Sequence, residues 1–136
     1  MPQISKVRIV NFNYNDGKRL IADELYDFSA IEQDNALNVL INLANGGGKS
    51  VLVQLMLQPL VPRAKVAGRG IESFFNKASD HCFVLLEWLK DNSPEKLLTG
   101  IAMSVSALAD DDSGRGRSIK YYTFYSNYTL KVKHVI

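Results

Sequence analysis

Apolar and polar side chains alternate along much of the chain, and this alternation predicts β-strands toward both ends of the sequence. Residues 4–12 carry the first such pattern, and Asp16-Gly17, in the polar stretch that follows, is a strong signal for a hairpin turn. A second strand is expected over residues 19–28. Further strands are predicted nearer the C-terminus, with a polar hairpin connection at residues 90–95, over residues 82–89, 97–108 and 119–125.

The middle of the chain has a different pattern, in which apolar residues run together. Residues 36–43 form a mostly apolar stretch of the kind found in a strand buried on both faces, and they end at a run of glycines. Residues 49–60 then predict a helix of about three turns that stops at Pro59 and Pro62. A basic loop over residues 63–70 and a short helical or turn segment at residues 71–75 are expected next.

The composition is that of an ordinary globular chain. Among the 136 residues, 46% are hydrophobic and 22% are charged, which suits one domain or part of a larger one. The sequence has no apolar run long enough to span a bilayer and no signal-peptide pattern, so we expect a cytoplasmic protein. The single cysteine, Cys82, lies in an apolar run and is expected to be buried. The net charge of +2 does not by itself indicate a nucleic-acid binder.

The glycine run ends in Gly-Lys-Ser where a predicted buried strand passes into a predicted helix, which is the context of a phosphate-binding loop. Glycines let backbone N–H groups approach phosphate oxygens, and the start of a helix adds a positive dipole. In this interpretation Lys49 contacts the β and γ phosphates as the catalytic cation, and the Ser50 hydroxyl binds Mg²⁺. The expected nucleotide-binding residues are Asn45, Gly46, Gly47, Gly48, Lys49, Ser50 and Val51.

The glycine run has the form Asn-Gly-x-Gly-Lys-Ser, and the hairpin before it begins with the strand Ile-Ser-Lys-Val-Arg-Ile-Val-Asn-Phe. Together they resemble the N-terminal half of the ATPase head in SMC, RecF and MukB-like ABC ATPases. The resemblance implies an α/β P-loop NTPase fold with a mixed β-sheet, and ATP with Mg²⁺ as cofactors. It implies three partners: a C-terminal half-head of the same protein beyond a coiled coil, a second head in a homodimer, and DNA. The implied role is chromosome segregation or maintenance, DNA repair or defence. In a bacterium the protein would be associated with the nucleoid.

The same resemblance adds basic residues to the candidate site. Arg8 lies on the first strand, where family members often place a basic residue near the nucleotide. The basic loop after the phosphate-loop helix contacts DNA or the partner's ATP in some members, and its counterparts here are Arg63, Lys65 and Arg69. A solvated loop is the competing interpretation for these three residues.

Several family features are missing, and each limits the chemistry expected of this chain. Leu43 replaces the first glycine of the full motif, no glutamine follows Gln58, and no Ser-Gly-Gly-Gln signature is present. The apolar run that ends at Glu87 is interpreted as a sheet-edge strand, and the acids at residues 110–112 as a hairpin loop, so neither supplies a Walker B acid. We therefore expect a fragment of a longer protein that binds ATP better than it hydrolyses it.

Two other classes of function remain open at this stage. One is a self-contained small P-loop enzyme such as a nucleotide kinase or GTPase, and the other is a non-enzymatic module that binds DNA or protein. The aromatic and basic residues between positions 120 and 133 favour strand packing against a core over a base-stacking strip on nucleic acid. His81, His134 and Cys82 do not have the spacing of a zinc site.

Overall fold

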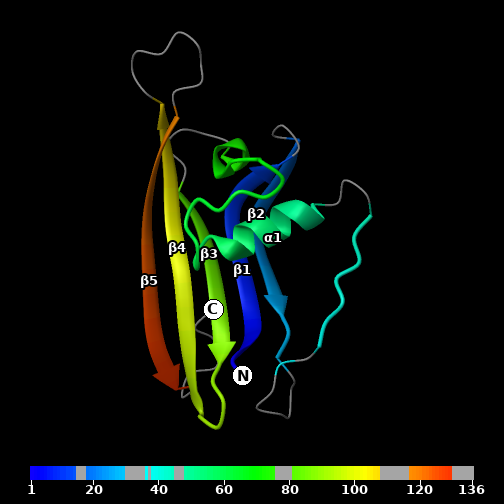
Figure 1. Cartoon of the computed structure of the whole chain (residues 1–136), viewed down its shortest axis with the longest axis vertical. Helices are drawn as coiled ribbons and strands as arrows, with labels where there is room; N and C mark the ends of the chain where they lie inside the picture. The colour runs from blue at the N-terminus through cyan, green and yellow to red at the C-terminus, as the bar shows by residue number, and fades with distance from the viewer. Residues whose placement is uncertain are drawn as a thin grey trace.

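The computed structural model of the chain describes residues 1–14, 18–29, 36, 38–44, 48–75, 81–107 and 117–129. Within these residues, five antiparallel strands form one open sheet in the order β2-β1-β3-β4-β5 (Figure 1). The fold is therefore mostly β, with one short α-helix. The elements in chain order are β1 (Gln3–Tyr14), β2 (Arg19–Asp27), α1 (Lys49–Leu57), the 3-10 helix η1 (Ile71–Phe74), β3 (His81–Leu89), β4 (Glu95–Ala107) and β5 (Arg117–Thr129).

Each strand predicted from alternation is present, and its ends lie within a few residues of the prediction. The polar connection at residues 90–95 is confirmed as the β3–β4 turn, and the short helical segment is confirmed as η1. The predicted Asp16-Gly17 turn lies outside the described residues. Alternation succeeds here because each strand has one face against the core and therefore needs a period of two.

The predicted α/β fold with a mixed P-loop sheet is wrong. The expected strand over residues 36–43 is absent from the sheet: Ala36 makes only an isolated bridge to Ser29, and residues 38–44 form no strand. In Figure 1 this segment runs outside β2. β1 already has β2 on one side and β3 on the other, so the segment has no place beside β1, and beyond the isolated bridge at Ser29 it does not extend the edge at β2. The apolar run is exposed, with Leu40 at 92%.

The hydrophobic core lies between one face of the sheet and helix α1, which packs against β1 and β3 (Figure 1). Val51, Leu52 and Leu55 are the buried apolar residues of the helix. They belong to one core with alternate residues of the strands, including Val7, Ile9, Val84, Leu86, Ile101 and Met103. Cys82 is fully buried in β3, as expected.

Helix α1 begins at Lys49 as predicted and ends at Leu57, three residues before the predicted end at 60. Pro59 lacks an N–H and cannot continue the helical ladder. Two buried glutamines organise the turn that follows. Gln58 donates to the backbone oxygens of Gln54 and Ala64 and accepts from the Arg63 N–H, while Gln54 donates to the oxygens of Ala64 and Arg69. The chain after the helix is thereby attached to it.

A buried carboxylate joins several strands of the sheet. Glu87, 1% exposed, accepts hydrogen bonds from Ser5 Oγ at 2.6 Å and from the Tyr128 hydroxyl, and its Oε1 lies 3.4 Å from Lys96 Nζ. Its strand, β3, is central in the sheet, so the expectation of a sheet-edge strand was wrong. Burial alone would raise the pKa of Glu87, but hydrogen bonds from Ser5 and Tyr128 and the charges of Lys96 and Lys6 lower it overall.

Candidate phosphate-binding site at the start of helix α1

Gly48 forms the junction between the glycine run and helix α1. Its φ of 91° lies in the left-handed region, and its carbonyl oxygen accepts the first helical hydrogen bond from the Leu52 N–H at 2.8 Å. A Cβ at this position would lie 3.3 Å from the ring of Tyr14 on β1. Backbone conformation and close contact both favour glycine here, so the last motif glycine has a local structural reason.

Lys49 and Ser50 occupy the first turn of α1, and both are exposed. The Lys49 ammonium donates to the backbone oxygen of Leu43 at 2.5 Å, so the side chain bends back across the start of the loop. Among the described residues, no side chain caps the start of the helix, and no acidic residue lies in its first turn. Backbone N–H groups at such a helix start lack intrahelical acceptors and carry a partial positive charge, which is the electrostatic setting that anions favour.

A cleft of about 280 Å³ lies beside Gly48. Within it, the Tyr26 hydroxyl donates to Glu24 Oε2 at 2.5 Å. Burial, followed by the hydrogen bond and charge of Glu24, raises the pKa of Tyr26 to about 12. Sequence reasoning missed these cleft residues; the available signal was the pair of aromatic residues on the two strands of the first hairpin. The lining residues are Tyr14, Arg19, Leu20, Ile21, Glu24, Tyr26, Leu43, Gly48 and Leu52.

The other residues predicted for nucleotide binding are not all placed together. Asn45, Gly46 and Gly47 lie outside the described residues. Val51 is 4% exposed and packs in the core, so it can offer a ligand only its backbone N–H.

Arg8 lies away from the loop. It alternates with the buried Val7 and Ile9 and so points to the sheet face opposite α1. There Arg8 donates to both carboxylate oxygens of Asp23, with Nε–Oδ1 at 2.9 Å and Nη2–Oδ2 at 2.7 Å. The hydrogen bond from Arg8 lowers the pKa of Asp23. The structure therefore does not bring Arg8 to the start of α1.

The predicted nucleic-acid residues lie in the loop after α1, and two of them contact neighbours. Arg63 Nη2 lies 3.3 Å from Glu72 Oε1, and the Arg69 guanidinium lies 4.9 Å from the centroid of the Phe74 ring. Lys65 is exposed between them. The loop is thus an exposed basic segment whose arginines are partly engaged within the chain.

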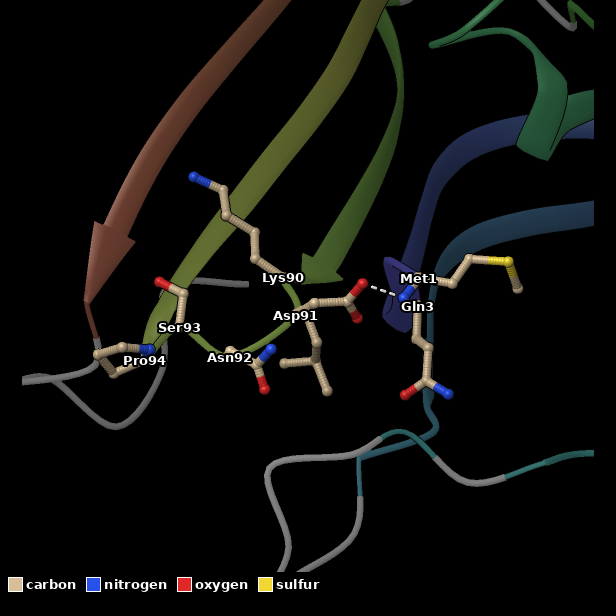
Figure 2. A pocket seen from close by; sticks show the side chains of 8 residues that line it. Met1, Gln3, Lys90, Asp91, Asn92, Ser93 and Pro94 are labelled. Atoms are coloured by element: carbon tan, nitrogen blue, oxygen red, sulfur yellow. Dashed lines mark hydrogen bonds and ion pairs between the residues drawn. The ribbon is translucent and has the colours of Figure 1, made fainter.

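A larger hollow, of about 640 Å³, lies at the β3–β4 turn (Figure 2). The N-terminal ammonium of Met1 pairs there with Asp91, while Lys90 turns aside to Glu95 and Asn127. The remaining lining consists of the polar residues Gln3, Asn92 and Ser93 and the apolar residues Leu89 and Pro94. Because its charged groups are already paired and none converges on a common point, this hollow is a weaker candidate than the start of α1.

Comparison with known proteins adds no identification: no family model matches the chain, and no curated protein matches it. Across the described ranges, no three His, Cys, Asp or Glu side chains gather in a way that could hold a metal ion. No helix in the described part of the chain is both long and apolar enough to cross a membrane.

Proposed function

We propose that the start of α1 binds the phosphate groups of a nucleoside triphosphate, with ATP as the ligand that the sequence resemblance favours. The observation that carries the proposal is the placement of the Lys49 ammonium against the Leu43 carbonyl, at an uncapped helix start that follows a left-handed glycine. A neutral carbonyl is a weaker partner for an ammonium than a phosphate. Bound phosphate would therefore replace Leu43 as the partner of Lys49.

The residues present also fit a magnesium nucleotide. Ser50 is exposed in the first helical turn and offers a hydroxyl oxygen, a ligand type that Mg²⁺ accepts. Mg²⁺ commonly keeps several waters and shares phosphate oxygens, so one protein ligand suffices for a nucleotide-bound ion. When bound, the ion would neutralise phosphate charge. The ring of Tyr14 and the apolar side chains of Leu43 and Leu52 border the adjoining cleft, which supports a place for the rest of the nucleotide.

Hydrolysis requires groups beyond those at this site. Glu24 is the acidic residue of the cleft, and it already accepts the Tyr26 hydroxyl hydrogen bond. We infer that this chain binds ATP and that hydrolysis needs a C-terminal half-head and a second head, in a DNA-associated SMC-like protein. The exposed apolar side chains of Val39, Leu40 and Ile41 support a missing structural partner, because such a run is costly to leave in water.

Calorimetric titration of the chain with MgATP tests the proposal through Lys49→Ala. Removal of the ammonium should weaken binding by at least about tenfold, since a charge-assisted hydrogen bond contributes about 1.5–3 kcal/mol. Lys120→Ala is the matched control, because it removes an exposed lysine on β5, outside the site, and should leave binding unchanged. Equal affinities for wild type and Lys49→Ala would reject the phosphate site. Turnover of ATP or GTP by the chain alone would favour a self-contained enzyme instead.

A further inference from the structure

Strand β5 forms one edge of the sheet and has little of the usual protection of an edge strand. It pairs with β4 along its whole length: Arg117 lies opposite Ala107 at one end, and Thr129 lies opposite Glu95 at the other. No other described residue pairs with its outer side. Edge strands are commonly protected by proline, by several charges or by a bulge. Between residues 118 and 129 there is no proline and Lys120 is the one charged residue. Figure 1 shows this long strand at the outside of the sheet.

Four of the exposed side chains of β5 are aromatic, contrary to the expectation that they pack into the core. Tyr121, Tyr122, Phe124 and Tyr125 are 42%, 75%, 40% and 78% exposed. Tyr121 and Tyr125 pair with Met103 and Thr99, on the sheet face that carries α1. Tyr122 and Phe124 pair with Ala102 and Gly100 and so lie on the opposite face. A nucleic-acid strand lying over one face would meet only half of these rings, whereas a β-strand along the edge would meet all of them.

We propose that β5 pairs antiparallel with β5 of a second copy of this chain, about a two-fold axis at Thr123. This register places Tyr121 opposite Tyr125 of the second copy and Tyr122 opposite its Phe124, so that every exposed ring gains an aromatic partner. Cross-strand aromatic pairs of this kind stabilise antiparallel sheets. The unpaired backbone groups of the two edges would satisfy each other over the same length.

The charges along β5 permit a second copy as the occupant. With the axis at Thr123, Lys120 faces the neutral Ser126 of the second copy, and Ser118 faces Tyr128, so no like charges meet between residues 118 and 128. An axis two residues earlier, at Tyr121, would place Tyr122 opposite Lys120 and Phe124 opposite Ser118, and would leave the two copies of Tyr121 as the one aromatic pair among these four rings. With the axis at Thr123, the edge is therefore self-complementary, as an isologous dimer requires.

Site-directed disulfide formation tests both the dimer and its register. In the proposed register the two Thr123 side chains face each other, with Cβ atoms about 4.5–5.5 Å apart, so Thr123→Cys should cross-link rapidly under mild oxidation. Ser126→Cys is the matched control, because its two copies would be six residues out of register, about 20 Å apart. The native Cys82 is fully buried and does not compete. We expect cross-linking at least tenfold faster for Thr123→Cys; equal rates, or no cross-link in either variant, would overturn the proposal.

Sedimentation velocity over a wide concentration series gives an independent readout that needs no cysteine. The wild-type mass should rise from 15.2 kDa toward twice that value. The variants Tyr121→Glu/Tyr125→Glu and Tyr121→Lys/Tyr125→Lys should each stay monomeric because like charges face each other, and their mixture should restore the dimer. Circular dichroism checks that both variants fold. A wild-type chain that remains monomeric but binds an oligothymidine would overturn the proposal in favour of nucleic acid. Lys49→Ala should leave the dimer unchanged, which separates this inference from the nucleotide site.

Discussion

Glu87 and Lys49 are two charged residues whose surroundings differ in almost every respect. The Glu87 carboxylate is buried and accepts hydrogen bonds from Ser5 and Tyr128, with Lys96 as its counter-charge. The Lys49 ammonium is exposed and donates to one backbone oxygen of a neighbouring loop residue. One charge is enclosed by partners from three other strands, and the other is held by a single replaceable contact.

The difference separates a charge that serves folding from one that is available to a ligand. A buried carboxylate is tolerated only when a counter-charge and hydrogen bonds offset the free energy lost when water is removed from it. The folded state therefore depends on the partners of Glu87. An exposed ammonium pays little for desolvation, and exchange of one carbonyl for a phosphate costs the fold little. Three measurements follow from this contrast.

Glu87→Gln should produce the largest effect. The substitution keeps the shape of the side chain but removes the negative charge that faces Lys96, and disruption of a buried ion pair costs about 3 kcal/mol of unfolding free energy. Urea unfolding monitored by circular dichroism measures the change. Glu95→Gln is the matched control: it removes a more exposed pair with Lys90 at 2.6 Å and should cost less than about 1 kcal/mol. Equal losses in both variants would remove the distinction between enclosed and open charges.

Acid should produce an intermediate effect through the same carboxylate. The folded-state pKa of Glu87 is lowered, so its contribution to stability is fully present above the unfolded-state pKa of about 4.3 and is lost as the pH falls through the lower folded value. The stability of the wild type should therefore fall more steeply below about pH 4 than that of Glu87→Gln. Parallel acid-unfolding curves for the two proteins would contradict the pKa direction.

Lys49→Ala should produce the smallest effect on folding. Its side chain is exposed and alanine has a high helix propensity, so the unfolding free energy should change by no more than about 0.5 kcal/mol. The same urea experiment measures it beside the nucleotide titration. A loss comparable to that of Glu87→Gln would show that Lys49 is a structural residue, which would undermine its assignment to a ligand.

The strands and the start of α1 were predictable because their signals are local. Alternation, apolar runs and turn residues located the strands, and the glycine run followed by a segment rich in Leu, Val, Met and Gln located the helix start at Lys49. The segment 36–43 was misjudged because an apolar run specifies burial but does not specify which strand will pair with it. Sheet pairing depends on residues far apart in sequence, and here β1 pairs with β2 and β3 rather than with this segment.

Within the candidate site, sequence reasoning identified residues that are neighbours in the chain and missed residues that strand pairing brings together. Gly48, Lys49 and Ser50 are neighbours in sequence and could be recognised together. Tyr14 and Tyr26 reach the cleft through the pairing of β1 with β2, which no short motif encodes. Arg8 was assigned to the site on resemblance alone, although its alternation with Val7 and Ile9 already placed it on the other face.

The glutamine contacts behind α1 have a consequence for local unfolding. The side-chain amides of Gln54 and Gln58 bond to the backbone at Arg63, Ala64 and Arg69, so the basic loop cannot separate from the helix without breaking several partly buried hydrogen bonds. The helix and the loop should therefore open together as one cooperative unit in hydrogen exchange, with similar protection on both. The proposed phosphate-binding end of α1 and the basic loop beyond its other end thus belong to one cooperative unit.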